Sequence, residues 1–278
     1  MYKERVIKTF KNLEFLLFVP DLILLIFTFL SGFVFVKYSG VLNLLTDANK
    51  LASSLRVADS IEALAPIFTS LVQKDVLVVL IYLLIFFLGG FVLGSGLLAM
   101  KFGMMKDVVE KKKLSLKNMY DHSMNHFWDV VWLRLTIFLI SLAVIVSFAM
   151  LASLNALNSF YQETFFILIS ILFLLTLIFL RFLLLFRYPA LFFDRTNSTQ
   201  TVKKLYDYFL KNYKHIILTW LVIFGFGLII VLLDLSLNKI TIISLLVIVI
   251  AIRYIINLIY NVWSDLFLFY NYKLEWNS

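Results

Sequence analysis

Four charged side chains lie within long stretches that are otherwise apolar. Asp21, Arg134, Arg181 and Arg253 each interrupt a run of the length, about 20 residues, that a helix needs to cross a membrane. A charge at such a position is costly in lipid, so it indicates a functional site by default. Counting about 1.5 Å per helical residue from the ends of these runs places all four charges in the same half of the bilayer, next to the positively charged loops. The sequence therefore predicts one polar cluster.

Two amide side chains extend the cluster along the last apolar run. Asn257 and Asn261 follow Arg253 at intervals of four residues, which puts them on one helical face, and Asp265 falls next on that face. Unlike arginine, asparagine is too short to reach the headgroups from inside a bilayer, so it must find partners. Our hypothesis is a polar pocket for a phosphate or carboxylate headgroup. It would be lined by Arg253, Asn257, Asn261, Arg181, Arg134 and Asp21.

The same residues also allow a structural interpretation. Arg134 and Arg181 could extend along their helices to nearby headgroups. Arg253 would then pair with Asp21 to hold the helices together, and the asparagines would form hydrogen bonds between helices. At the level of the sequence both interpretations stay open.

Two histidines have a spacing that metal sites use. His122 and His126 are four residues apart, and Asp129 follows three residues later on the same face. The alternative is the polar face of a helix that lies at the membrane surface. We expect no metal site and no cofactor. The chain has no cysteine, which excludes thiolate ligands and a cysteine nucleophile. It also lacks the usual nucleotide and hydrolase motifs, so we assign no catalytic residue.

The second apolar run contains closely spaced glycines. Gly90 and Gly94 form a pair of small residues four apart, which lets another helix approach closely. We interpret the pair as a helix-packing contact; a glycine-lined pathway or a homodimer face is the alternative.

Composition shows what positions these residues. The 278 residues are 62% hydrophobic and 15% charged, and the mean hydropathy is +0.96. These values lie far outside those of a water-soluble domain. We therefore predict an all-α polytopic membrane bundle of six transmembrane helices. The expected spans are 13–36, 76–99, 130–154, 164–186, 216–233 and 240–270. The first run is too long for a cleaved signal peptide, and we expect it to stay as a span.

Lysine and arginine give the orientation. They concentrate in the N-terminal tail, in 101–117 and in 187–214, all on one side of the predicted membrane. The rule that positive loops stay inside predicts a multi-pass protein of the cell membrane with cytoplasmic N- and C-termini. The net charge of +8 is explained by this asymmetry, so we expect no nucleic-acid partner. The run Lys111–Lys113 would attract anionic lipid headgroups on the cytoplasmic side.

Part of the sequence occurs twice. Shifted by 86 residues, Leu116–Leu133 matches Val202–Thr219, with Lys117, Tyr120 and Asp121 falling on Lys, Tyr and Asp. Each copy starts amphipathic and continues into an apolar run, as a segment does that lies at the membrane surface before it crosses. We predict a single transmembrane domain of three repeated hairpins, 1–100, 101–195 and 196–278. The first would carry an outer amphipathic insertion over 37–74, either a structural cap or a lid or docking segment.

The six spans in three hairpins resemble a known family over nearly the whole chain, and the most specific likeness begins at the end of the fourth span. The segment Phe186–Ala190 (FRYPA), then Phe193-Asp194, is followed by an amphipathic run over Val202–Tyr213. This pattern resembles the membrane domain found beside some bacterial glycerophosphoryl diester phosphodiesterases and in related archaeal and bacterial membrane proteins. The resemblance implies a six-helix membrane fold and no catalytic residues, because the phosphodiesterase domain itself has no counterpart here.

Three functions fit these observations. The first is a non-enzymatic, lipid-contacting scaffold or accessory membrane subunit, with membrane lipids and a protein partner or a second copy as its partners. The second is a transporter or channel for a small anion or an anionic lipid, which would use the predicted polar pocket. The third is a metal-dependent membrane enzyme built on His122, His126 and Asp129.

Overall fold

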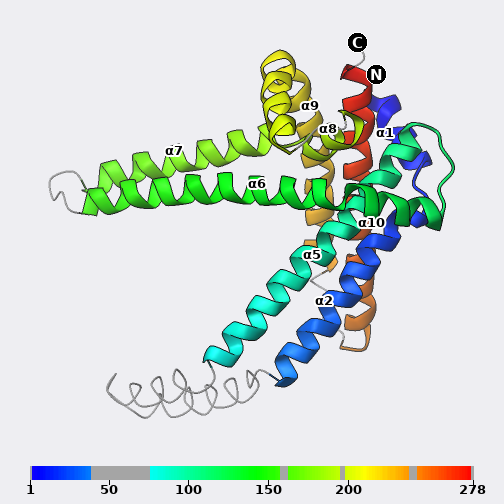
Figure 1. The fold of residues 1–278 in the computed structure, drawn as a ribbon, viewed down its shortest axis with the longest axis horizontal. Helices are drawn as coiled ribbons and strands as arrows, with labels where there is room; N and C mark the ends of the chain where they lie inside the picture. Colours follow the sequence, from blue (N-terminus) through cyan, green and yellow to red (C-terminus); the bar gives the residue numbers. More distant parts are fainter. Residues whose placement is uncertain (1, 39–75, 157–161, 195–197, 238–242, 277–278) are drawn as a thin grey trace. The chain divides into compact units, whose positions relative to one another are not determined.

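A computed structural model describes residues 2–38, 76–156, 162–194, 198–237 and 243–276 (Figure 1). In this part of the chain every secondary-structure element is a helix, as predicted. In chain order they are α1 (Tyr2–Lys11), the 3-10 helix η1 (Phe15–Phe18), α2 (Val19–Tyr38), α5 (Val76–Val109), α6 (Leu116–Ala156), α7 (Gln162–Leu183), α8 (Arg187–Asp194), α9 (Ser198–Leu237) and α10 (Ile243–Trp276). The predicted insertion over 37–74 lies almost wholly outside the described residues.

The predicted number of membrane-spanning helices is confirmed. Within the described residues, six helices are long and apolar enough to cross a membrane. Their apolar parts are little covered by protein: the most apolar window of α6 buries none of its residues, and that of α5, the most buried of the six, only 28%. Burying such side chains is the main favourable term in folding, so these helices need lipid around them.

The chain divides into two compact units, Met1–Pro20 with Leu98–Ser278, and Asp21–Leu97. In the first unit α6 packs against α7, and α9 packs against α10 (Figure 1). We describe each unit by itself.

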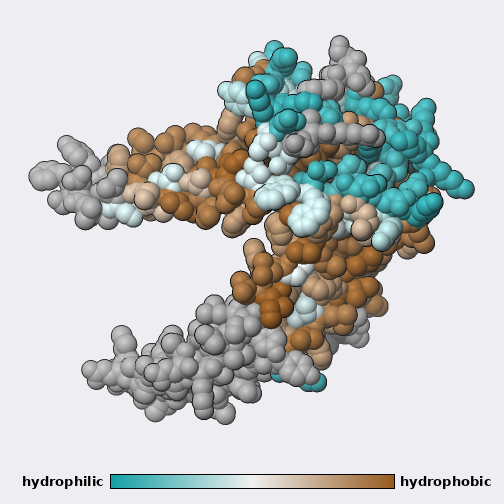
Figure 2. Space-filling view, in the orientation of Figure 1, coloured by the Kyte–Doolittle hydropathy of each residue, from teal (hydrophilic) through white to brown (hydrophobic). Residues whose placement is uncertain are grey.

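The buried core of the larger unit lies toward one end of its long helices. It includes Phe102, Met104 and Met105 of α5, Leu133 of α6, Phe192 of α8 and Phe269 of α10. Figure 2 shows the hydrophilic residues of this unit gathered over α1, α8, the start of α9 and the end of α10, while the α6–α7 pair is mainly hydrophobic. At one end of this unit the helices pack around a buried core and have a polar surface, and their long apolar parts extend away from that end.

The predicted end of the second span is wrong. We placed it at Ala99, but α5 continues to Val109. Lys101, Lys106 and Asp107, which we assigned to a loop, are buried at 4–8% exposure. The helix continues because these charges have partners on other helices: Lys101 pairs with Asp265 at 2.8 Å, and Lys106 Nζ donates to the Phe192 carbonyl at 2.8 Å.

A break separates α7 from α8, at residues 184–186. Pro189 explains where the chain resumes its helix, because proline lacks an N–H and is tolerated in the first helical turn but not in the interior. Helix α8 is short, yet it buries Ala190, Leu191 and Phe192. The FRYPA motif is thus a turn followed by a buried helix that carries core side chains.

The N-terminal helix is fixed to α10 by polar contacts. Arg5 Nη1 donates to Asn271 Oδ1 at 2.7 Å, and Asn12 Nδ2 donates to the Tyr270 hydroxyl at 2.6 Å. Phe10 stacks on Trp263 with ring centroids 5.3 Å apart. These contacts make α1 part of the packed end of the unit.

The two copies of the repeated stretch fold differently in one respect. Helix α6 continues unbroken from Leu116 through its span, whereas α9 kinks at Asn212, where φ is −124° and ψ is 26°. On α6, exposed apolar and aromatic side chains recur every four residues, at Leu116, Tyr120, Met124, Trp128 and Trp132. The predicted amphipathic segment is therefore helical and presents this stripe outward.

Within the smaller unit, glycines of α5 differ in what surrounds them. A Cβ built on Gly90 would meet no atom within 4 Å, whereas one built on Gly89 would lie 3.9 Å from Phe27 Cζ of α2. Gly94, the other residue of the predicted packing pair, is buried.

Candidate functional site

A cavity of about 650 Å³ in the larger unit gathers side chains from α5, α6, α7, α8 and α10. Its charged lining consists of Arg134, Arg181, Arg187 and Asp265. Its remaining walls are apolar or aromatic, formed by Leu98, Phe102, Leu185, Tyr188, Pro189, Leu268 and Phe269. The volume lies within the range of small-molecule sites, about 300–1,000 Å³.

Stacked rings form one wall of this arginine cavity. Phe102 stacks on Tyr188 with centroids 4.0 Å apart, and on Phe269 with centroids 5.7 Å apart. The Arg187 guanidinium lies over the Tyr188 ring, 4.9 Å from its centroid. Stacking of this kind contributes about 0.5–1.5 kcal/mol per aromatic pair in addition to the effect of burying the rings. Phe102 is therefore held in place by Tyr188 and by Phe269.

The charges of the cavity are unequal. Asp265 is the one acid in its lining, and Lys101, only 5% exposed, already pairs with it at 2.8 Å. Arg181 forms no ion pair with any described residue, and Arg187 Nη1 makes a long hydrogen bond to the Leu184 carbonyl, at 3.5 Å. Three guanidinium groups therefore surround one cavity whose only carboxylate is neutralised by a lysine. Such a site favours an anion, and guanidinium pairs well with phosphate or carboxylate.

Two tryptophans lie close to arginines of the cavity, Trp132 on α6 and Trp220 on α9. Trp132 precedes Arg134 by two residues, which is about 3 Å along α6, and it is 55% exposed. On the other side, Phe182, next to Arg181, contacts Trp220 with centroids 5.2 Å apart. Tryptophan is enriched at the headgroup level of a bilayer. The arginines of the cavity thus lie at the level of two tryptophans.

Of the arginines predicted to form one cluster, Arg134 and Arg181 line the cavity, and Arg253 does not. Arg253 Nε donates to Asp234 Oδ1, and its Nη2 donates to the Asp234 carbonyl at 3.1 Å. Asp234 is close to the end of α9, and Arg253 lies twelve residues, about 18 Å along α10, from Asp265. The pair with Asp234 satisfies Arg253 at the other end of the hairpin, so it is not part of the cavity.

The two amides predicted to share a site with Arg253 have no partner in the described part of the chain. Asn257 and Asn261 are exposed on α10, and no hydrogen bond joins either side chain to a described residue. Asp21 lies in the first turn of α2, in the smaller unit. A carboxylate there is stabilised by the positive end of the helix dipole.

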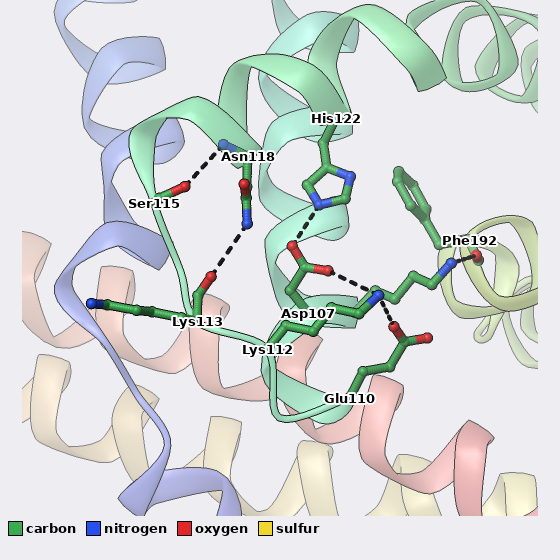
Figure 3. Close-up of polar contacts among 9 residues, drawn as sticks. Asp107, Glu110, Lys112, Lys113, Ser115, Asn118, His122 and Phe192 are labelled. Atoms are coloured by element: carbon green, nitrogen blue, oxygen red, sulfur yellow. Dashed lines mark hydrogen bonds and ion pairs between the residues drawn. The ribbon is translucent and has the colours of Figure 1, made fainter.

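The histidines of α6 face the protein rather than the membrane surface. His122 Nε2 lies 2.7 Å from Asp107 Oδ2, and Lys112 bridges Asp107 to Glu110, at 3.9 Å and 2.6 Å (Figure 3). A Cβ added to Gly103 would overlap His122, so only glycine allows this close approach of α5 and α6. His126 Nδ1 is 3.5 Å from Asp129 Oδ2. Among the described residues no three His, Asp or Glu side chains converge as metal ligands would.

Several residues of the site were not predicted. We counted Arg187 only as a topology signal, and we placed Lys101 in a loop. The signal that could have identified Arg187 is the FRYPA motif, in which a proline two residues later limits how far the preceding helix can extend.

Comparisons with known proteins give no match to a family model, to a curated protein or to a solved structure. The resemblance to the phosphodiesterase-associated membrane domain therefore stays a hypothesis.

Proposed function

We propose that this protein is a non-enzymatic, multi-pass membrane protein that binds the headgroup of an anionic lipid in the arginine cavity. The observation that carries the proposal is the convergence of Arg134, Arg181 and Arg187 on one cavity at the level of Trp132 and Trp220. The ligand's phosphate would lie among the guanidinium groups, and its acyl chains would follow the exposed apolar surfaces of α6 and α7.

The chemistry of the cavity supports a phosphodiester headgroup. Arginine forms paired hydrogen bonds to phosphate, and hydrogen bonds to a charged group are worth about 1.5–3 kcal/mol. The pairing of Asp265 with Lys101 leaves the arginines as the excess charge. The aromatic wall gives the glycerol part of a headgroup an apolar surface to pack against.

A second observation supports contact with lipid in general. The stripe from Leu116 to Trp132 is exposed along the start of α6 and leads directly into the span. A lipid-facing stripe of this kind is typical of helices that lie at the membrane surface, with Trp at the headgroup level.

The test is retention of lipid by the purified protein. The protein is reconstituted in nanodiscs of phosphatidylcholine with a minor fraction of phosphatidylglycerol, extracted in detergent, and examined by native mass spectrometry. We expect about one phosphatidylglycerol per chain, retained in preference to phosphatidylcholine. Arg187→Gln, Arg134→Gln and Arg181→Gln should each reduce this preference roughly tenfold or more, the equivalent of losing one charged hydrogen bond.

Lys203→Gln is the matched control, because Lys203 is exposed on α9 and does not line the cavity. It removes the same charge and should leave retention unchanged. If all four variants lose phosphatidylglycerol equally, binding follows net charge and not this cavity, and the proposal is wrong.

A further inference from the structure

A second cavity, of about 630 Å³, lies in the larger unit between α1, the end of α5 and α10. Its charged lining consists of four lysines and two glutamates: Lys8, Lys11, Lys111, Lys112, Glu4 and Glu14. The lining therefore carries two more positive than negative charges, and the pairing of Lys112 with Glu110, which is not in the lining, reduces this excess to one. Asn12 and Tyr270 form a polar wall, and Ile7, Val108 and Val109 an apolar one. None of these residues lines the arginine cavity.

The lysines of this cavity are held in place by different means. Lys8 Nζ lies over the Tyr270 ring, 5.1 Å from its centroid, and the Tyr270 hydroxyl is fixed by Asn12 at 2.6 Å. Lys112 is occupied by Glu110, 2.6 Å away. Burial raises the pKa of Glu110, but its hydrogen bond to Lys112 and the charges of Lys106, Lys112 and Lys273 outweigh this and lower it. Glu110 is therefore ionised at neutral pH and keeps Lys112 paired.

Lys11 and Lys111 are different, because neither forms an ion pair with a described residue. Two lysines without acidic partners beside one cavity create a positive potential that an anion would neutralise. The packing of α1 on α10 forms the walls of the cavity, so they exist before any ligand binds.

The backbone at Lys111 is unusual. Its φ is 61°, a left-handed conformation that favours glycine. The Lys112 amide donates to the Asp107 carbonyl at 2.8 Å and the Lys111 amide to the Val108 carbonyl at 3.0 Å, which is the hydrogen-bond pattern of a helix C-cap that usually carries glycine at this position. The chain has a lysine there at some cost in stability, and that side chain lines the cavity.

We propose that this lysine cavity is a second anion-binding site, which takes a small phosphorylated molecule. Its phosphates would be bound by Lys11, Lys111 and Lys8. Asn12 and the two glutamates offer acceptors for hydroxyl groups of the same ligand. The source of the phosphate is either a soluble phosphate ester or a phosphorylated lipid headgroup.

The left-handed conformation of Lys111 provides a test in which loss of folding cannot explain loss of binding. The full chain is purified in a neutral detergent and titrated with inorganic pyrophosphate by isothermal calorimetry. We expect saturable binding that weakens with added salt. Lys111→Gly should raise Kd about tenfold or more while leaving the unfolding midpoint equal or higher, because glycine suits φ 61°. Lys11→Gln should raise Kd similarly.

Lys113→Gln is the matched control. The Lys113 side chain extends away from the group formed by Asp107, Glu110 and Lys112 (Figure 3), and it does not line the cavity. This variant should keep the native Kd. Arg187→Gln tests whether pyrophosphate is bound in the arginine cavity instead. The proposal is overturned if pyrophosphate does not saturate, if Lys113→Gln weakens binding as much as Lys111→Gly, or if only Arg187→Gln weakens it.

A second arm identifies the source of the phosphate. The protein is reconstituted in nanodiscs of phosphatidylcholine alone or with phosphatidylinositol 4-phosphate, and the titration is repeated. A native Kd in both nanodiscs supports a soluble phosphate ester. A Kd raised only by the phosphorylated lipid, and not in Lys111→Gly, supports a headgroup at the same site.

Discussion

Replacing Gly103 with alanine would place a methyl group in the space that the His122 side chain occupies. The added Cβ would overlap the Cβ and ring atoms of His122. Because the His122 Cβ is fixed to the backbone of α6, a change of rotamer cannot remove the whole overlap. Either α5 and α6 move apart locally, or His122 leaves Asp107.

The size of the effect follows from these two responses. Overpacking of a core contact costs about 1–3 kcal/mol. Loss of the 2.7 Å hydrogen bond from His122 leaves the Asp107 carboxylate, 5% exposed, with only the distant Lys112 for compensation. Leaving a buried acceptor without its partner costs about 1–3 kcal/mol. We therefore expect Gly103→Ala to lower the free energy of unfolding by about 2–4 kcal/mol.

Gly225→Ala is the matched control. It makes the same substitution within α9, at a position where an added Cβ meets no atom within 4 Å. Because alanine has the higher helix propensity, this variant should be neutral or more stable by up to about 1 kcal/mol. Both variants are unfolded by SDS in mixed micelles and followed by circular dichroism.

A double substitution tests the mechanism. His122→Ala removes the obstacle, so Gly103→Ala in that background should cost at least about 1 kcal/mol less than in the native protein. If Gly103→Ala is as stable as Gly225→Ala, the contact between α5 and α6 at this position does not exist and the reasoning fails.

Two further predictions concern polar contacts outside the cavities. Asn271→Ala removes the oxygen that accepts a hydrogen bond from the buried Arg5 side chain, and it should lower the free energy of unfolding by about 1.5–3 kcal/mol. Helix α1 should then detach more often, which would appear as faster hydrogen exchange over residues 2–11. Unchanged exchange would contradict the packing of α1 on α10. Asp234→Asn removes the charge that pairs with Arg253, and it should lower the unfolding midpoint without changing the retention of phosphatidylglycerol. A loss of retention would indicate that Arg253 belongs to the lipid-binding site.

The membrane-spanning helices could be predicted from the sequence, because lipid constrains their composition. A helix that crosses a membrane must be apolar for about 20 residues, so the six spans could be read from hydropathy alone. Arg134 and Arg181, which line one cavity, could also be singled out from the sequence, because an arginine near the end of an apolar run stands out from its neighbours and its position along the helix follows from counting residues. Both arguments use only the residues next to each other in the chain, so a single sequence is enough to make them.

What could not be predicted depends on pairs that are distant in the chain. The continuation of α5 past Ala99 rests on Lys101 meeting Asp265 and on Lys106 meeting the Phe192 carbonyl. Arg253 was grouped with the other arginines because counting residues along a helix cannot show that Asp234, near the end of α9, is its partner. Gly103 carries no spacing signal, and its importance appears only once His122 lies against it.

The most direct test of the central claim is an experimental structure of the protein in phosphatidylglycerol nanodiscs, refined with lipid. We predict phosphate density within hydrogen-bonding distance of the guanidinium groups of Arg134, Arg181 and Arg187. Density for water alone in that cavity, with ordered lipid only along the long apolar parts of the helices, would contradict the claim that the protein binds an anionic headgroup there.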